Sequence, residues 1–241
     1  MTKFVELEPV ERVLVVVAHP DDVDFGSAGT IAKWVSQGSQ VAYCIVTDGD
    51  AGGFDPKIDR SAMPAIRKGE QTNAARIVGV SDLTFLGYKD GELQVTMGLR
   101  KDISRKIRQF KPDRVLCQSS ERNYERIYAS HPDHLAAAEA TICAVYPDAR
   151  NPFAFPELLV EHLEAHSVNE VVMQASPNPN SYTDITDFID AKISAILEHK
   201  SQLPNPDETA AFVKDWVGSA ALAVGLPEGR YVEMYQMVST G

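Results

Sequence analysis

Two copies of one tripeptide hold the residues of this chain that are best suited to chemistry. His-Pro-Asp occurs at 19–21, where Asp22 follows, and again at 131–133, where His134 follows. Together the copies can place two imidazoles and a carboxylate around one metal ion. Another carboxylate and another imidazole are then left for proton transfer. This set of groups predicts metal-assisted hydrolysis.

The spacing within each copy suits a shared metal ion. His131 and His134 lie three residues apart in the first turn of an expected helix, so both side chains can point to one side. His19 and Asp22 have the same spacing at a turn from strand to helix. Imidazole and carboxylate are good zinc ligands, and three protein ligands with one open position are typical of catalytic zinc sites. A water bound there would titrate near about pH 7.

The segments around the motifs are typical of an α/β protein. Short runs rich in Val, Ile and Leu predict buried parallel strands, and helical spacing between Pro and Gly signals predicts helices. The alternation predicts a Rossmann-like, doubly wound and mostly parallel sheet with helices on both faces. The expected strands are 12–18, 40–46, 83–86, 113–117 and 169–174, and the expected helices are 30–37, 65–78, 99–110 and 131–145.

The last third of the chain is less regular. Residues 151–158 contain Pro and Phe and predict a loop, whereas 183–201 and 208–223 have helical spacing. Residues 231–238 alternate enough to predict a final edge strand. The sequence contains no convincing linker, so we expect one domain over residues 1–241.

The two motifs should meet in space although they are far apart in sequence. In open α/β sheets, ligands bind beyond the carboxyl ends of the strands, where the strand order reverses. The first motif follows the first expected strand and the second follows the fourth, and these strands are neighbours in the commonest doubly wound order. We therefore expect the imidazoles of His19 and His134 to lie within about 6 Å of each other.

Composition restricts the partners and the compartment. The chain has 241 residues, a net charge of −11 and a pI near 5.0, and such an acidic surface argues against nucleic acid as a partner. The apolar run at 13–18 is too short to span a membrane, and the first residues lack the pattern of a signal peptide. Three cysteines do not make a disulfide framework, which favours a reducing cytoplasm.

A set of short motifs resembles one known family over residues 12–202. Residues 19–26 are similar to the first signature of the PIG-L/LmbE-like zinc-dependent N-acetylglucosaminyl deacetylases. Further similar elements are Thr47-Asp48-Gly49-Asp50-Ala51-Gly52, the Arg67-x-x-Glu70 helix, Asp90-Gly91-Glu92-Leu93, His131-Pro132-Asp133-His134 and, more weakly, His199-Lys200-Ser201-Gln202. The elements occur in the family's order, which is more specific than any one of them.

The resemblance implies a single deacetylase-like domain that removes an acyl group, usually acetyl, from the nitrogen of an amino sugar or its conjugate. It implies His19, Asp22 and His134 as the zinc ligands. These ligand types do not exclude Fe²⁺ or another divalent ion. A small-molecule amino sugar would be the partner. Self-association into a homo-oligomer is also compatible with the resemblance, although the sequence has no apolar stripe that would establish it.

The resemblance also implies roles for the remaining motif residues. Asp21 would be the general base that takes a proton from the attacking water. His131, oriented by Asp133, would stabilise the oxyanion or protonate the leaving amine. Arg67 would bind substrate near the site, although spacing alone favours a surface ion pair with Glu70.

Other functions stay open at the level of the sequence. One alternative is an amidase that acts on a thiol-cofactor conjugate. Another is a sugar- or nucleotide-binding α/β module without hydrolysis, although the Gly-x-Gly-x-x-Gly fingerprint of nucleotide binding is missing. Phosphoester hydrolysis suits one His-Asp-His site less well than a two-metal site. A single His-Pro-Asp could also be a turn followed by a helix cap, and the second copy with its accompanying motifs weakens that interpretation.

Overall fold

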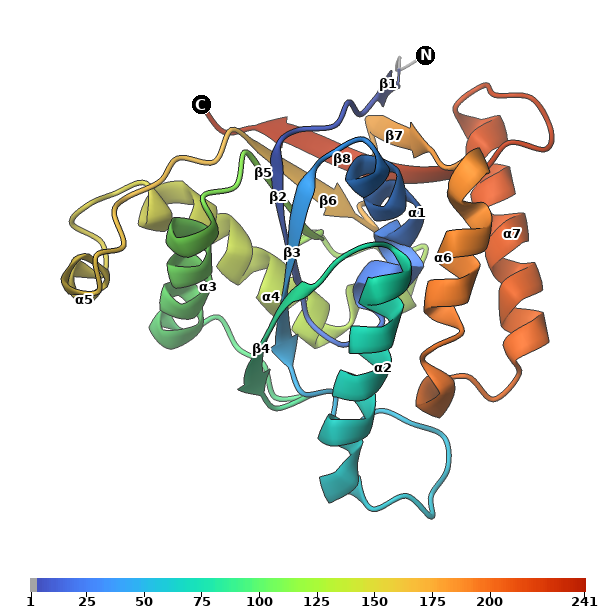
Figure 1. Cartoon of the computed structure of the whole chain (residues 1–241), viewed down its shortest axis with the longest axis horizontal. Helices are drawn as coiled ribbons and strands as arrows, with labels where there is room; N and C mark the ends of the chain where they lie inside the picture. Colours follow the sequence, from blue (N-terminus) through green and yellow to red (C-terminus); the bar gives the residue numbers. More distant parts are fainter. Residues whose placement is uncertain (1–3) are drawn as a thin grey trace.

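The apolar run before the first motif forms β2 (Arg12–Val17), an interior strand of an eight-stranded sheet (Figure 1). The structure is a computed structural model that describes residues 4–241. Every residue from Val13 to Val17 is fully buried, as expected for a strand covered on both faces. On one side β2 pairs with β3 (Gln40–Thr47) and on the other with β5 (Arg114–Gln118), in both cases parallel.

The sheet has the expected doubly wound, mostly parallel arrangement. Its strand order is β1-β7-β8-β6-β5-β2-β3-β4, and only β8 runs antiparallel to its two neighbours. From β2 the chain first builds outward through β3 and β4, and then continues on the other side through β5 and β6. The strand order therefore reverses between β2 and β5. The remaining strands are β1 (Val5–Glu6), β4 (Asp82–Tyr88), β6 (Glu170–Gln174), β7 (Ser181–Asp184) and β8 (Val232–Ser239).

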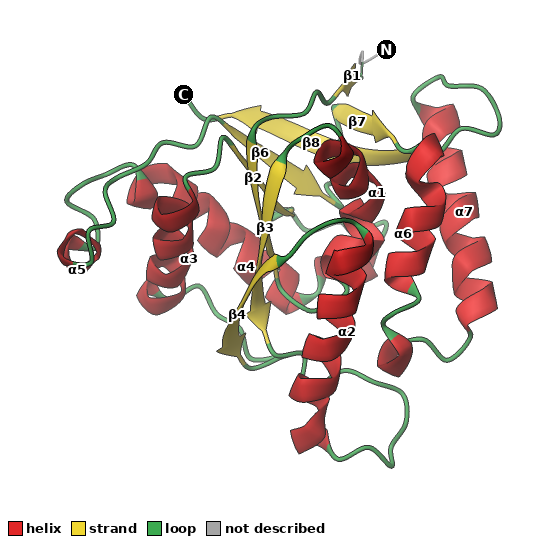
Figure 2. Cartoon of the chain, viewed as in Figure 1, coloured by secondary structure: helices red, strands yellow, loops and turns green. Residues whose placement is uncertain are grey.

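Helices cover both faces of the sheet (Figure 2). One layer holds α1 (Asp22–Ser36), α2 (Met63–Ile77) and α6 (Ile189–Ile196), with α7 (Pro206–Ala223) beside α6. The other layer holds α3 (Met97–Phe110) and α4 (Pro132–Cys143), and the short α5 (Pro156–Val160) lies at its periphery. Among residues 4–241, none of the helices has the length and apolar character needed to cross a bilayer.

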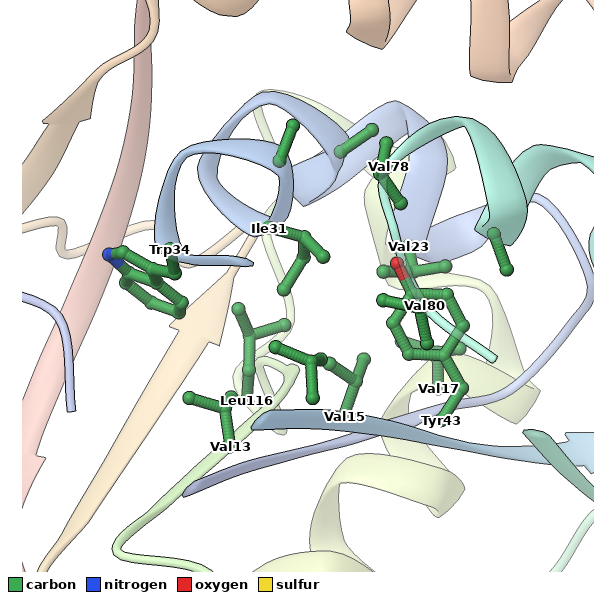
Figure 3. Packing of buried hydrophobic residues seen from close by; sticks show 14 of the residues in the cluster. Val13, Val15, Val17, Val23, Ile31, Trp34, Tyr43, Val78, Val80 and Leu116 are labelled. Atoms are coloured by element: carbon green, nitrogen blue, oxygen red, sulfur yellow. The ribbon is translucent and has the colours of Figure 1, made fainter. Parts of the chain in front are cut away.

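Alternation along β2 divides the core into two layers. Val13, Val15 and Val17 pack on the α1 side against Ile31 and Trp34 (Figure 3). The alternate residues of the same strand pack on the other side, against α3 and α4. Because successive side chains of a strand point to opposite faces, one short apolar run anchors both helical layers. The end of β2 is thereby fixed in position for the motif that follows it.

Helix α1 begins at Asp22, so our expectation of a helix from residue 30 was wrong at its start. Two glycines concealed the first turns because Gly is a weak helix former. Both are needed for close packing. A Cβ on Gly26 would lie 2.1 Å from Oε1 of Gln174, and a Cβ on Gly29 would lie 2.7 Å from Ile185. The first motif therefore leads directly into the helix.

The expected helix over 183–201 was also wrong at its start, because its first residues belong to β7. In β7, Ser181 and Thr183 are buried while Tyr182 and Asp184 are partly exposed, which is the alternation of a strand. The strand expected over 231–238 forms as β8, but it is interior and lies between β6 and β7. Local spacing could not specify this pairing, which depends on strands far apart in sequence.

A buried ion pair joins this part of the sheet to the helical layer. Nζ of Lys192 on α6 lies 2.6 Å from a carboxylate oxygen of Glu233 on β8 and also donates to the carbonyl oxygen of Asp24 at 3.0 Å. Glu233 accepts the backbone N–H of Thr30 at 2.7 Å. Both charged side chains are almost completely buried, so each depends on the other for compensation of its charge.

Replacing Lys192 by Met should therefore destabilise the protein strongly. The change leaves the carboxylate of Glu233 buried without its cation, and we expect the free energy of unfolding to fall by about 3–5 kcal/mol. Denaturant unfolding of the purified variant measures this change. Lys214→Met, at an exposed position of α7, is the control and should change stability by less than about 0.5 kcal/mol. A loss below about 1 kcal/mol for Lys192→Met would contradict the interpretation.

Candidate metal centre and active site

The two His-Pro-Asp motifs meet at the carboxyl ends of β2 and β5. The ring centroids of His19 and His134 are 5.2 Å apart, and that of His131 is 5.0 Å from His19 and 5.4 Å from His134. This confirms the expectation that the motifs converge. The cause is the strand order, because β2 and β5 are neighbours and their carboxyl ends lie at the same edge of the sheet.

The carboxylate of Asp22 lies between two of these imidazoles. One oxygen is 3.0 Å from Nε2 of His134, and the other is 3.3 Å from Nδ1 of His19. Two ligands of one tetrahedral zinc ion, each about 2.0–2.1 Å from the metal, lie about 3.3 Å apart. Asp22 therefore has one oxygen beside each imidazole, at separations close to those of two ligands on one ion.

The other ring nitrogens of the two histidines are held by acceptors. Nε2 of His19 lies 3.1 Å from Asp90 and 3.2 Å from Asp133, and Nδ1 of His134 lies 3.2 Å from the carbonyl oxygen of Ala129. A hydrogen bond to an acceptor fixes the tautomer of a metal-binding histidine and orients its ring. In both rings the nitrogen that faces Asp22 is left to bind metal.

His131 is oriented differently from these two histidines. Its Nδ1 accepts the backbone N–H of Asp133 at 3.2 Å, so its Nε2 carries the proton in the neutral ring. We expected Asp133 to orient His131. Its backbone N–H contacts that ring, whereas its carboxylate contacts His19 and accepts the backbone N–H of Gly91 at 2.7 Å. Burial, together with the imidazoles of His19 and His134, lowers the pKa of His131.

In the absence of metal, the charged side chains of the cluster shift one another's pKa values. Burial alone would lower the pKa of His19, but Asp22 and the neighbouring carboxylates raise it to about 12. Burial likewise opposes protonation of His134, yet Asp22 raises its pKa. The carboxyl group of Asp22 would itself be raised by burial, but the imidazoles of His134 and His19 hold its pKa well below the ordinary value.

Asp21 lies beside this cluster and is held by Arg67. The guanidinium donates to the Asp21 carboxylate at 2.9 Å and to the carbonyl oxygen of Gly49 at 3.1 Å. Burial raises the pKa of Asp21, although the charge of Arg67 opposes the shift. Only 3% of Arg67 is exposed, so this residue supports Asp21 from beneath the surface.

Two groups of residues in the described part of the chain could hold a metal ion. The first is His19, His131 and His134, and the second is His19, Asp90 and Asp133. Asp90 follows β4 at the same edge of the sheet, but sequence reasoning gave it no role. Its position at the end of a strand, directly before a glycine, was the signal that could have identified it.

A cavity of about 210 Å³ borders Asp22 and His134. Its wall is mainly apolar and includes Phe25, Trp216 and Met234. Tyr128 lies in this wall, whereas Phe54 and Tyr124 are exposed side chains outside it. Pockets of this kind, with an apolar wall and a few polar groups, bind small organic molecules. The wall also contains Gln118, a buried residue whose Nε2 has no hydrogen-bond partner within residues 4–241.

The fold and this cluster define a doubly wound α/β protein with a histidine–carboxylate centre at the point where the strand order reverses. Comparison with known families agrees with that class. The family model PIG-L, described as GlcNAc-PI de-N-acetylase, matches residues 14–145, which is more than half of the chain. The protein belongs to this family, and the resemblance noted in its motifs is confirmed.

Named relatives act on amino sugars. The chain is 32% identical to a diacetylchitobiose deacetylase from Thermococcus kodakarensis, over 95% of this chain and 84% of that protein. It is 30% identical to a probable N-acetyl-alpha-D-glucosaminyl L-malate deacetylase 2 from Bacillus anthracis, over 79% of this chain and 81% of that protein.

Solved structures give the same fold. The N,N'-diacetylchitobiose deacetylase from Pyrococcus horikoshii, complexed with its inhibitor MPG, superposes with a TM-score of 0.87 at 30% identity, over 95% of this chain and 84% of that one. A 4-carboxy-2-hydroxymuconate hydratase from Pseudomonas putida superposes with a TM-score of 0.78 at 20% identity, over 96% of this chain and 98% of that one. The second likeness concerns the fold alone.

Metal binding should displace protons from the centre. The pKa of His19 is raised to about 12 and that of His134 is also raised, so without metal both rings hold a second proton more tightly than a free imidazole does, and a metal ion can bind only after such protons leave. We expect zinc affinity to increase as the pH rises from about 6 to 8. Calorimetric titration in two buffers of different ionisation enthalpy should detect proton release.

A ligand variant tests the same centre. His134→Ala should weaken zinc binding by at least about tenfold, because it removes a donor atom that faces Asp22. His162→Ala, an exposed histidine outside the cluster, should bind zinc like the parent protein. Zinc affinity that is independent of pH, or unchanged in His134→Ala, would contradict the assignment of this centre.

Proposed function

We propose that the protein is a zinc-dependent amidohydrolase that removes the N-acetyl group from an amino sugar or an amino-sugar conjugate. The observation that carries the proposal is the convergence of the two His-Pro-Asp motifs, which gathers metal donors, a carboxylate base and a proton-bearing imidazole at one edge of the sheet. The relatives named as amino-sugar deacetylases support the substrate class.

His19, Asp22 and His134 would hold the zinc ion. The hydrogen bonds from the other ring nitrogens to Asp90, Asp133 and a backbone carbonyl support this choice. His131 suits the ligand role less well, because its Nδ1 already accepts a hydrogen bond and its Nε2 bears the proton. A zinc ion, when bound, supplies a Lewis acid for the substrate carbonyl and makes its water more acidic.

The side chains around the ion would complete the hydrolysis. Asp21 takes a proton from the attacking water, and its raised pKa favours that transfer. His131, through its Nε2–H, donates a hydrogen bond to the developing oxyanion or a proton to the leaving amine. Asp133 orients His131 through its backbone N–H. Arg67 stays our candidate for substrate binding, and its guanidinium also holds the carboxylate of Asp21.

The cavity beside Asp22 and His134 would receive part of the substrate. Its volume of about 210 Å³ is below the usual range for a whole drug-sized ligand, so it suits one portion of the molecule. The free Nε2 of Gln118 offers a donor to a substrate oxygen. The aromatic ring of Trp216 in its wall supplies an apolar surface.

The proposal also includes a cytoplasmic location, a small-molecule substrate and self-association. All three cysteines are free thiols, and Cys44 and Cys117 are buried, which supports a reducing cytoplasm. The acidic composition supports a small-molecule substrate and argues against nucleic acid. We retain a homo-oligomer as a prediction, and light scattering of the purified protein would test it.

A second candidate function has one observation in its favour. The chain is 29% identical, over 61% of its length, to a mycothiol S-conjugate amidase from Streptomyces coelicolor, and covers 55% of that protein. An amidase acting on a thiol-cofactor conjugate would use the same residues. The two candidate functions differ in their substrate. A panel of test substrates should therefore include N-acetylglucosamine, diacetylchitobiose, a GlcNAc–malate conjugate and a thiol conjugate.

The proposal predicts that Asp21→Asn binds metal but hardly turns over. Loss of a general base should lower kcat by about 10²–10⁴-fold, while the zinc content measured by elemental analysis stays unchanged. Release of free amine from the preferred substrate of the panel measures kcat. Asp82→Asn, an exposed carboxylate at the opposite end of β4 from Asp90, is the control and should keep parental activity.

Removal and return of the metal complete the test. A chelator should abolish amine release, and zinc should restore it. A zinc-loaded Asp21→Asn protein with full activity would remove Asp21 from its role. Parent protein that stays fully active after verified loss of metal would overturn the zinc-dependent mechanism.

A further inference from the structure

Behind Asp21 lies a buried chain of hydrogen bonds that the hydrolytic mechanism above does not use. The backbone N–H of Asp21 donates to Oε1 of Gln71 at 2.8 Å, and Nε2 of Gln71 donates to Oδ2 of Asp24 at 2.8 Å. The same Asp24 oxygen lies 2.7 Å from Nε2 of His199. The side chains of Gln71, Asp24 and His199 have no exposed surface, so water does not substitute for these bonds.

The chain has a defined direction. The Asp24 carboxylate accepts hydrogen bonds and has nothing to donate, so the amide nitrogen of Gln71 must face it. The amide oxygen of Gln71 is then left for the N–H of Asp21. If the amide rotated by half a turn, an oxygen would face the carboxylate and an NH₂ would face the N–H, and both bonds would be lost. Asp24 therefore fixes the orientation of Gln71, and His199 supports Asp24.

Asp21 needs an external support of this kind. Its φ of 95° lies in the left-handed region, which costs a residue other than glycine about 1–3 kcal/mol. It precedes helix α1 as the N-cap residue, but its side chain makes no capping hydrogen bond. The strained backbone turns the carboxylate away from the helix end and toward Arg67, which it meets at 2.9 Å.

Helix α2 supplies both supports of Asp21. Arg67 and Gln71 are four residues apart and therefore lie on the same face of the helix, one turn apart. Arg67 holds the carboxylate of Asp21 and Gln71 holds its backbone N–H. Two contacts at different points of one residue fix both its position and its rotation, which a single contact does not.

We propose that Gln71 is a positioning residue for the reaction. Its Oε1 holds the Asp21 backbone in the strained conformation from which the carboxylate can take a proton from the attacking water, and the Asp24–His199 pair keeps the Gln71 amide in the required orientation. The inference rests on the proposed function, in which Asp21 is the general base. Gln71 touches neither substrate nor metal and acts only through Asp21.

Gln71→Leu tests the inference, because leucine keeps the apolar bulk and removes the amide. A base displaced by about 1 Å can lose about 10²-fold in rate, so we expect kcat to fall by about 10–100-fold. KM and zinc content should not change, since Gln71 touches neither substrate nor metal. Asn73→Leu removes an amide from an exposed position two residues further along α2 and should keep the parental kcat. Parental kcat in Gln71→Leu would overturn the proposal.

A double variant separates a positioning role from a general loss of structure. If Gln71 acts through Asp21, then adding Gln71→Leu to Asp21→Asn should lower the residual kcat no further, because the base is already absent. Effects that multiply would overturn the proposal. Asp24→Asn gives a second approach: the new amide can donate, so Gln71 is free to rotate, and kcat should fall in the same direction without a change in KM.

A measurement without substrate keeps this inference distinct from the proposed function. In Gln71→Leu the amide proton of Asp21 loses its acceptor, and we expect its hydrogen exchange, followed by NMR, to accelerate at least tenfold relative to the parent and to Asn73→Leu. If the parent released no amine from any substrate, the proposed function would fail and the exchange rate would still test the support of Asp21. An unchanged exchange rate would overturn the role of Gln71.

Discussion

The carboxylate of Asp22, placed between the imidazoles of His19 and His134, is the contact on which the site depends. It joins the turn after β2 to the start of α4, two segments more than a hundred residues apart. Its backbone is fixed as well, because Nε2 of Gln174 donates to the Asp22 carbonyl oxygen at 3.0 Å. This glutamine side chain occupies the space left by the missing Cβ of Gly26. A glycine that weakens the helix thus lets a residue from β6 support the turn that carries Asp22.

Much of the fold could be predicted from the sequence because its signals are local. Strands β2, β3, β5 and β6 have buried apolar runs, and the rule for ligand sites in doubly wound sheets was sufficient to bring His19 and His134 together. The errors arose where packing between distant segments decides the structure. The start of α1 was placed too late, and the sequence does not show the contacts of Gly26 with Gln174 and of Gly29 with Ile185 that favour glycine there.

The convergence of the two motifs was predictable, whereas the individual contacts within the cluster were not. Residue types and motif order indicated the members of the cluster, but not which atom faces which partner. The carboxylate of Asp133 contacts His19, and its backbone N–H contacts His131, a division that no spacing rule contains. Asp90 and Gln71 were missed in their roles because each contributes only through tertiary contacts. A hydratase with 20% identity has the same fold, so the sheet alone does not specify the chemistry. The side-chain contacts at the edge of the sheet must specify it.

The separation of the donor groups along the chain has a consequence for how metal binding and folding are linked. In an unfolded chain, closing a loop of more than a hundred residues to bring His134 to His19 carries a large entropic penalty. The ordered sheet removes that penalty before an ion arrives. A bound ion would in turn act as a cross-link that favours the native state over the unfolded ensemble. Metal occupancy would then protect the enzyme against denaturation, and a chain that stops before β5 would hold one motif without the geometry to use it.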